Sequence, residues 1–419
     1  MSRTENRRIK VLHVITELVV GGAQDNTFLT VEGLDRSRYQ VDLMGGAGGS
    51  WEARARAVSD RLFVLPSLTR SLSLSGHARA VAQIARLLRR ERYDVVHTHS
   101  ANAGLVGRWA AALARTPVVV HTYHTVPGED RTFSPRMRRV LVGLEKATTP
   151  LTDRIVTVCD PNLERSVELK LARRDRLTTV LSGIDLRRFE NPADPAEVRR
   201  ELGIEEGWPV VGFVARLAPQ NAPEVFIEAA RRYLARHPRT CFVVAGGGPA
   251  DAEVRRLAAD LPQVRFVGHR EDVPRLMQAF DLYVSTAAWA GLGRSLSEAM
   301  ISGRSVVATD VGGVGEVVRT GETGILVPPN DPAAVVAGIE RLLGERALAA
   351  ALGAAAHREM VPRFGAGEMV RALDELYVEL LRGKGIEVPA GGAPPPAPRP
   401  ARPAHAAGPV AGNGRTVIL

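Results

Sequence analysis

The 419-residue chain is poor in cysteine, in aromatic residues and in long apolar runs. Its two cysteines, Cys159 and Cys241, lie in apolar, strand-like stretches, which excludes a disulfide-stapled scaffold and predicts two buried thiols in a reducing compartment. The longest apolar candidate for a membrane span is broken by Arg108 and Arg115, so no segment has the roughly 18 apolar residues needed to cross a bilayer. We therefore expect a cytoplasmic protein.

Lysine is scarce, and the formal net charge of +9 comes almost entirely from arginine. Such a balance is typical of proteins with a polyanionic partner, either nucleic acid or an anionic membrane face, or else of a compositional bias toward Arg, Ala and Gly. Because basic and aromatic residues do not interleave and no nucleic-acid motif is present, we exclude nucleic acid. Peripheral contact with the inner membrane face stays open.

The spaced-glycine pattern of dinucleotide-binding proteins is also missing. Glycines follow strand-like segments at Gly21-Gly22, Gly45–Gly49 and Gly246–Gly248, but none completes that pattern, which makes a nicotinamide cofactor unlikely. At Gly21-Gly22 two interpretations are equally good. The glycines either let a phosphate approach the start of the next helix or form a simple tight turn.

Short β-branched runs alternate with longer helical patterns along the chain, and the alternation restarts near residue 210. This pattern predicts an α/β protein with two doubly wound, parallel-sheet (Rossmann-like) domains. Asn191-Pro192 and Asp194-Pro195 punctuate the link between them. The predicted parts are a first domain at 1–188, a second at 189–365, a helix at 366–382 that packs back on the first domain, and a disordered Pro/Ala/Gly-rich tail at 383–419.

Four histidines lie at the ends of two predicted strands. His97 and His99 flank Thr98 at one strand end, and His121 and His124 close the next strand. Carboxyl ends of neighbouring parallel strands meet at a ligand crevice, so a metal site is conceivable. Half-buried imidazoles that bond the backbone are the commoner outcome for the first three. We predict no metal site and a ligand-facing loop at His124.

Basic and acidic side chains mark the second half of the chain. Arg216 follows its first strand, where a guanidinium can grip a diphosphate through two charge-assisted hydrogen bonds, although a plain surface arginine is the alternative. A glycine-containing turn at 285–294 then leads into a predicted helix at 295–302 that carries Glu298. Unpaired N–H groups at a helix start attract phosphate, and a carboxylate one turn inside can accept both ribose hydroxyls.

Together these residues resemble glycosyltransferase family 4, a family of retaining enzymes with the GT-B fold. The resemblance runs from about Lys10 to Leu381 and is specific through the order and spacing of its motifs. These include VLHVITELVVGGAQ, VLSGIDLRRF, GFVARLAPQ, FVVAGGGP, FVGHREDVPRLM and LSEAMISGRSVVATDVGGVGEVVRTGETGILVPP. It implies two Rossmann-like domains that face each other across a cleft and hold a nucleotide-diphosphate sugar.

The resemblance also implies a role for each matching position. Gly22 would lie near the donor phosphates and the acceptor. The implied catalytic residues are His124 at the donor sugar, Arg216 at the diphosphate and Glu298 at the ribose. The implied lining of the base is Gly246, Gly247, Gly248, Pro249, His269 and Arg270, and the implied donors to phosphate and sugar are Leu292, Gly293 and Arg294. The family needs no metal and no cofactor.

Two departures from the family pattern bear on activity. Family members usually carry Lys-Gly where this chain has Asn221-Ala222, and Glu where it has Ala290. Each missing charge-assisted hydrogen bond costs roughly 1.5–3 kcal/mol. Ala290 also leaves space for a different sugar substituent.

Three functions are compatible with this pattern. The first is a transferase that moves a hexose-type sugar, with retention, to a glycan, lipid-linked or small-molecule acceptor. The second is a catalytically weakened homologue that binds nucleotide or supports another transferase, which robust turnover would exclude. The third is a sugar-nucleotide epimerase, which would need no acceptor. A helix near Arg136, Arg138 and Arg139 also pairs basic with apolar residues, as membrane-surface helices do.

Overall fold

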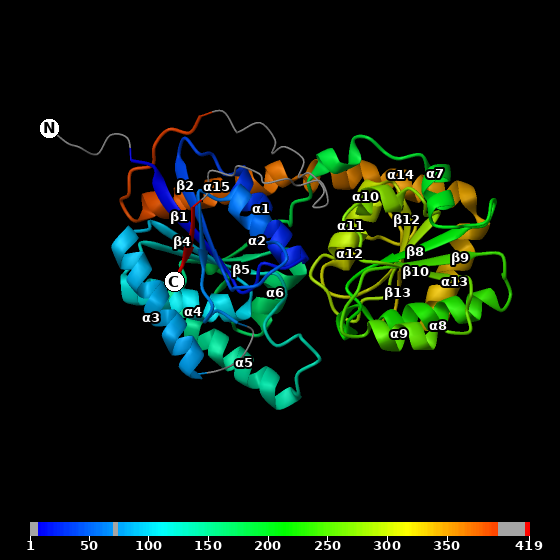
Figure 1. Ribbon diagram of the computed structural model, residues 1–419, viewed down its shortest axis with the longest axis horizontal. Helices are drawn as coiled ribbons and strands as arrows, with labels where there is room; N and C mark the ends of the chain where they lie inside the picture. The colour runs from blue at the N-terminus through cyan, green and yellow to red at the C-terminus, as the bar shows by residue number, and fades with distance from the viewer. Residues whose placement is uncertain (1–6, 70–73, 393–414) are drawn as a thin grey trace. The chain divides into compact units, whose positions relative to one another are not determined.

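The computed structural model describes residues 7–69, 74–392 and 415–419 (Figure 1). It divides into two compact units. The first comprises Met1–Gly128, Ser134–Asp185 and Phe364–Leu419, and the second comprises Glu129–Phe133 and Leu186–Arg363. The boundary predicted at residue 188 therefore falls three residues inside the second unit. The chain returns to the first unit after Arg363, two residues before the boundary predicted at residue 365.

The first unit is built on an eight-stranded sheet in which every pair is parallel, with the order β14-β3-β2-β1-β4-β5-β6-β7. Its strands are β1 (Ile9–Ile15), β2 (Tyr39–Gly45), β3 (Arg61–Val64), β4 (Val95–His99), β5 (Val118–Tyr123), β6 (Arg154–Thr157), β7 (Leu177–Thr179) and β14 (Arg415–Ile418). The strand order reverses between β1 and β4, and ligands of doubly wound proteins bind outside the carboxyl ends of the strands at such a point.

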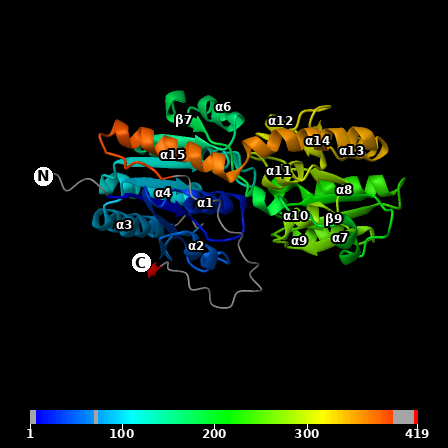
Figure 2. The same cartoon turned by 90° about the horizontal axis from the view of Figure 1, so that it is seen from above.

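Helices cover both faces of this sheet. They are α1 (Gly22–Gly33), α2 (Glu52–Val58), α3 (Leu74–Glu91), α4 (Ala101–Ala114), α5 (Pro135–Thr148), α6 (Asp160–Glu168) and α15 (Ala366–Gly383), with short 3-10 turns η1 (Thr149–Leu151) and η2 (Arg174–Arg176). Figure 2 shows α15 along α1, and Tyr377 of α15 is fully buried in the core that α1 also lines. The opposite core is formed by α3 and α4.

The second unit repeats the same design with six parallel strands in the order β10-β9-β8-β11-β12-β13. The strands are β8 (Val210–Val214), β9 (Cys241–Ala245), β10 (Val264–Gly268), β11 (Leu282–Ser285), β12 (Ser305–Thr309) and β13 (Ile325–Val327). The helices are α7 (Pro195–Glu201), α8 (Pro223–Leu234), α9 (Asp251–Leu257), α10 (Val273–Met277), α11 (Arg294–Ile301), α12 (Val314–Val317), α13 (Pro332–Gly344) and α14 (Arg346–Arg363), with 3-10 turns η3 (Leu186–Phe189) and η4 (Pro219–Asn221). The reversal point lies between β8 and β11.

Local chemistry explains several helix starts. Ser134, Asp194 and Asp331 each precede a proline at the first or second helical position, and each side chain accepts a backbone N–H of the first turn. The proline lacks an N–H that would otherwise be unpaired, and the side-chain oxygen satisfies another. The apolar strands between these helices are almost fully buried because both sheet faces are covered. The predicted two-domain, doubly wound α/β fold is confirmed, and Cys159 and Cys241 are both buried, as predicted.

The predicted disordered tail is wrong at its end. Residues 415–418 form β14, which pairs in parallel with β3, and Val417 and Leu419 pack against the core under α3 and α4. The edge strand β3 offers unpaired backbone groups, and the β-branched and apolar residues of the last segment can satisfy them and bury surface at the same time. The prediction is also wrong at the start of the tail: α15 includes Gly383, Ile386 and Val388 pack against the core of the first unit, and Arg38 donates to the carbonyl oxygen of Pro389 (3.1 Å). Residues 393–414 lie outside the described residues.

Candidate functional site

The loops that leave the carboxyl ends of the second unit's strands are hydrogen-bonded to one another. Leu217, after β8, donates its N–H to Gly247 after β9 (3.0 Å), and Gly246 donates to Gly268 at the end of β10 (2.7 Å). Gly246 has φ +132, and a side chain there would collide with the carbonyl oxygen of Ala215. Glycine is therefore required for this close approach, which places Arg216 beside the Gly246–Gly248 loop.

The loops after β11 and β12 extend this edge. Ala288 N–H donates to Gln220 O (2.8 Å), and Gly313 N–H donates to Gly291 O (2.8 Å). Gly312 has φ +53, and a side chain there would collide with the carbonyl oxygen of Ala290. The predicted glycine-rich turn is thus held between the loop after β8 and the loop after β12, and it ends at Gly293, which caps α11 with φ +81.

Arg216 is exposed, and within the described part of the chain its guanidinium has no hydrogen-bond or ion-pair partner. Its carbonyl oxygen accepts a hydrogen bond from Asn221 Nδ2 (2.8 Å), so Asn221 ties down the loop that carries Arg216. The next residue, Ala222, has φ +40, a left-handed conformation that costs a residue other than glycine about 1–2 kcal/mol. Where family members usually carry Lys-Gly, this chain therefore has Asn221, which hydrogen-bonds its own loop and carries no charge, and Ala222, whose backbone is strained.

Glu298 lies on α11 and is 4% exposed. Its Oε1 atom is 3.4 Å from Nε of Arg294 and 3.8 Å from Nη1 of Arg188. Burial and, secondarily, the Glu298 charge raise the pKa of the nearby Tyr283. A buried carboxylate needs such cationic partners. Arg188 was missed by the sequence analysis because nothing in its neighbourhood along the chain points to α11.

His269 and Arg270, predicted to line the base, follow β10. His269 is exposed, whereas the guanidinium of Arg270 is held by Asp272 (2.7 and 2.8 Å) and Glu201 (3.0 Å). The Asp272 hydrogen bonds, reinforced by Glu201, raise the pKa of Arg270. Pro249 and Leu292 lie in the same loops as their predicted neighbours, at the ends of β9 and β11.

In the first unit the reversal point between β1 and β4 carries a strained turn. Gly22 is the exposed first residue of α1, which begins seven residues after β1 ends. Ser100, after β4, has φ +65, and its hydroxyl lies 2.7 Å from that of Thr16. Strain at a residue other than glycine is common at binding sites. Neither Thr16 nor Ser100 was predicted, because the strain depends on the strand-to-helix turn and leaves no trace in composition.

The histidines at the strand ends are more buried than predicted. His97, His99 and His121 are at most 2% exposed, and they are joined by His13 of β1, which pairs in register with His97. His97 contacts the hydroxyls of Tyr377 (2.5 Å) and Thr122 (2.7 Å) rather than the backbone. His121 lies on the opposite face of the sheet, and its Nδ1 atom contacts the backbone carbonyl oxygen of Thr98 (3.0 Å), as predicted.

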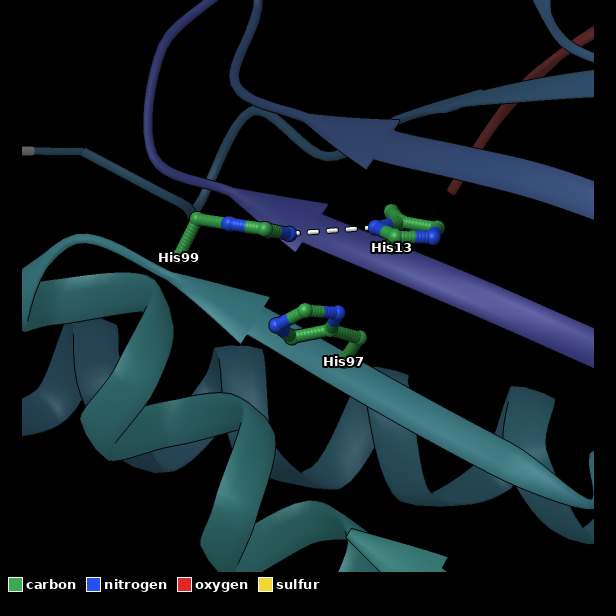
Figure 3. Close-up of side chains that lie close together, drawn as sticks. All are labelled: His13, His97 and His99. Atoms are coloured by element: carbon green, nitrogen blue, oxygen red, sulfur yellow. Dashed lines mark hydrogen bonds between the residues drawn. The ribbon is translucent and has the colours of Figure 1, made fainter. Parts of the chain in front are cut away.

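Figure 3 shows His13, His97 and His99 close together, with a 3.0 Å contact between His13 Nδ1 and His99 Nε2. One ligand atom from each lies within 4.8 Å of the others, so this is the group that could hold a metal ion. However, both nitrogens of His97 and the two facing nitrogens of His13 and His99 already make contacts that a metal would have to displace.

Among the described residues, His13 and His99 do not find hydrogen-bond partners for all of their ring nitrogens. The outer atoms His13 Nε2 and His99 Nδ1 are buried and have no partner among the described residues. A contact between two neutral imidazoles uses one N–H, so one of these outer atoms carries a hydrogen without an acceptor. The cluster therefore lacks an acceptor and does not present three free metal ligands.

His124 follows β5 in an irregular segment, and its ring stacks on that of His99 with centroids 5.6 Å apart. Its Nε2 atom is buried and has no partner among the described residues, although the residue keeps some exposure. Burial lowers the pKa of His124 to about 4, so the ring is neutral at pH 7. A neutral imidazole can exchange hydrogen bonds with a sugar hydroxyl without carrying charge.

A buried ion pair lies behind this strand end. Arg108 of α4 is fully buried and forms a fork with Glu145 of α5 (2.6 and 2.8 Å), whose Oε1 atom also accepts a hydrogen bond from Tyr123 (2.5 Å). Burial alone raises the pKa of Glu145, but the hydrogen bonds and charge of Arg108 outweigh it and lower the pKa to about 2. The pair fixes the end of β5 that precedes His124.

Comparison with known proteins places this arrangement in a family. A family model described as Glycosyltransferase Family 4 matches residues 20–188, and one described as Glycosyl transferases group 1 matches residues 208–345. A D-inositol 3-phosphate glycosyltransferase of Thermobispora bispora is 33% identical over 321 residues, which cover 72% of this chain and 74% of the relative. The UDP-Gal:alpha-D-GlcNAc-diphosphoundecaprenol alpha-1,3-galactosyltransferase of Escherichia coli is 25% identical over 91% of this chain and 100% of the relative.

Solved structures show the same fold. HepE of Anabaena in complex with UDP-glucose matches with a TM-score of 0.77 at 23% identity, covering 89% of this chain and 100% of that chain. No helix in the described ranges is both long and apolar enough to span a bilayer.

Proposed function

Because the chain belongs to glycosyltransferase family 4, we propose that it transfers a hexose-type sugar from a nucleoside-diphosphate sugar, with retention of anomeric configuration. The acceptor is a glycan, a lipid-linked glycan or a small molecule. One observation carries the proposal. Hydrogen-bonded loops at one edge of the second unit present the exposed guanidinium of Arg216, a glycine-capped helix start and a buried carboxylate, which are the groups that a nucleoside diphosphate needs.

Each group has a distinct role in this proposal. Arg216 neutralises the charge that develops on the leaving diphosphate, and the N–H groups at the start of α11, after Gly293, bind the phosphate oxygens. Glu298 accepts hydrogen bonds from the ribose hydroxyls. His124 holds a hydroxyl of the donor sugar as a neutral ring. With an arginine and helix amides at the phosphates, the reaction as proposed uses no metal ion and no cofactor.

The nucleoside of the donor is proposed to be uridine. The Escherichia coli relative is named for UDP-Gal, and HepE was solved with UDP-glucose. Asn221 and Ala290 adjust the choice of sugar, since Asn221 bonds the Arg216 loop and supplies no cation, and the buried Ala290 supplies no carboxylate. The alternative, a weakened homologue, would bind nucleotide without turnover.

Titration calorimetry with nucleoside diphosphates and their sugars should show binding of UDP and of at least one UDP-hexose. In Glu298→Gln the affinity should fall roughly ten- to hundred-fold, because the amide keeps the size but loses charge-assisted hydrogen bonds. Glu253→Gln, an exposed change on α9, serves as the control. Lack of affinity for every nucleotide tested, or lack of transfer and donor hydrolysis across a broad panel, would contradict the proposal.

We also propose that the first unit contacts an anionic membrane surface through α5. Arg136 and Arg139 are exposed, and the apolar Val140 and Leu144 are 54% and 43% exposed. Basic and apolar side chains on one helix surface are typical of interfacial helices. This contact would bring a lipid-linked acceptor to the protein.

Flotation with phosphatidylglycerol vesicles at low salt tests this contact. The unaltered protein should co-float, and Arg136→Gln with Arg139→Gln should reduce the floated fraction several-fold, since each basic residue near the surface contributes about 1 kcal/mol. The double variant Arg255→Gln, Arg256→Gln on α9 makes the same change in net charge and should float like the unaltered protein. If both double variants lose the same floated fraction, net charge alone explains the binding and α5 is not the contact.

A further inference from the structure

Arg188 links two elements of the second unit that lie far apart in sequence. It belongs to η3, directly after the chain enters this unit. Its Nη2 atom donates to the carbonyl oxygen of Glu271 (2.7 Å), and its Nη1 atom lies 3.8 Å from Oε1 of Glu298. One guanidinium therefore spans the loop after β10 and the buried carboxylate on α11.

The contacts of Arg188 with Glu271 and with Glu298 differ in length and in the charge of the acceptor. The bond to Glu271 is short and has a neutral acceptor, so it fixes the guanidinium plane. The approach to Glu298 is longer than the 2.7–2.9 Å typical of a charged hydrogen bond, so it acts mainly through charge. A hydroxyl group can therefore reach the carboxylate without first breaking a short bond to Arg188.

The loop after β10 belongs to the hydrogen-bonded loops at the carboxyl ends of the second unit's strands. Glu271 follows His269 and Arg270, and Gly268 just before them accepts the N–H of Gly246. The same guanidinium thus bonds this loop and lies near the Glu298 carboxylate. Arg294 adds a second guanidinium at 3.4 Å from Oε1, on the helix of Glu298 itself.

We propose that Arg188 is a positioning residue for nucleoside recognition, which couples the ribose-binding carboxylate Glu298 to the loop at 269–271. The inference rests on the proposed function of this edge. An ammonium group does not replace Arg188, because only a planar fork reaches Glu271 O and Glu298 Oε1 at once. The coupling is specific to the ribose hydroxyls and leaves the diphosphate contacts of Arg216 unchanged.

The experiment compares two probes, UDP and 2′,3′-dideoxy-UDP, by titration calorimetry on the full chain. The unaltered protein should prefer UDP roughly ten- to hundred-fold, since the dideoxy compound lacks the hydroxyls that Glu298 accepts. Arg188→Met should lower this preference to about three-fold or less, with little change in the affinity for dideoxy-UDP. Arg188→Lys should also lower it, and Arg200→Met, an exposed change on α7, should leave it intact.

Each outcome is decisive. A full preference in Arg188→Met or in Arg188→Lys overturns the inference, because either result shows that the fork is not needed. Equal losses for both probes in Arg188→Met also overturn it, since they indicate a general structural role. An unaltered protein that binds both probes equally contradicts the role of Glu298, and one that binds neither overturns the proposed function and this inference with it.

Discussion

Lowering the pH from 7.5 to about 5 should lower the free energy of unfolding of the first unit by about 5 kcal/mol or more. Five histidines in the first unit have pKa values held below their ordinary range, mainly by burial: His13, His97, His99, His121 and His124. The pKa falls to about 3 for His13 and to about 4 for His124. These rings are neutral in the folded protein and take up protons on unfolding.

The direction follows from proton linkage. Between pH 6.5 and about 4 the unfolded chain binds more protons than the folded one, so the free energy of unfolding falls as the pH falls. At pH 5.5 each such histidine costs about 1 kcal/mol, and five cost about 5 kcal/mol or more. Domains are stable by about 5–15 kcal/mol, so this loss is a large share of the total.

Urea unfolding between pH 5.0 and 8.0 measures this dependence. Replacing His99 with Gln should lower the slope by about one proton, whereas replacing the exposed His237 in the second unit should leave the first unit's transition unaltered. A free energy of unfolding that stays flat from pH 7.5 to 5.5 would show that the five rings titrate normally in the folded state.

Arg108→Met should destabilise the first unit by about 3–5 kcal/mol at pH 7, because it leaves the Glu145 carboxylate buried without its partner. The folded-state pKa of Glu145, about 2, lies below its unfolded value. The pair therefore stabilises the protein above about pH 4.5, and this contribution is lost as the pH falls toward 2. In Arg108→Met the pKa of Glu145 should rise, so acid should no longer remove stability in that range.

The double variant Arg108→Met, Glu145→Leu separates pairing from packing. It should be more stable than Arg108→Met alone, because no uncompensated charge stays in the core. Arg173→Met, which breaks an exposed pair with Asp175, should change the free energy of unfolding by less than about 1 kcal/mol. If Arg108→Met behaves like Arg173→Met, the fork with Glu145 carries no stability.

The fold could be predicted because short stretches of the sequence indicate most of its strands and helix starts. Each buried strand is a short β-branched run, and Pro after Ser134, Asp194 or Asp331 marks a helix start within one or two residues. The strand β14 could not be predicted in this way. Its residues follow a Pro/Ala/Gly-rich stretch, and they form a strand only because the edge of β3 is available to them.

The places of the candidate site residues could be predicted where they depend on position after a strand. Arg216 and the turn before Glu298 were found because strand ends and helix starts can be recognised in the sequence. His13 and Arg188 could not be found, because their partners are reached through register or through a distant loop: His13 meets His97 across β1 and β4, and Arg188 meets Glu298 across 110 residues. The histidines were expected to be half-buried because the sequence does not reveal how closely α4 and α15 cover the sheet.

The two units share a strand order, but their loops are suited to different kinds of ligand. In both sheets the central pair of strands marks where the chain turns to opposite sides, yet the loops there have different chemistry. In the first unit they carry the hydroxyls of Thr16 and Ser100, next to the ring of His99, which are groups that sugars and alcohols can bond. In the second they carry a cation and amides, suited to anions. Under the proposed function, a change of acceptor would then need changes in the first set of loops alone and would leave the diphosphate contacts of Arg216 unaltered.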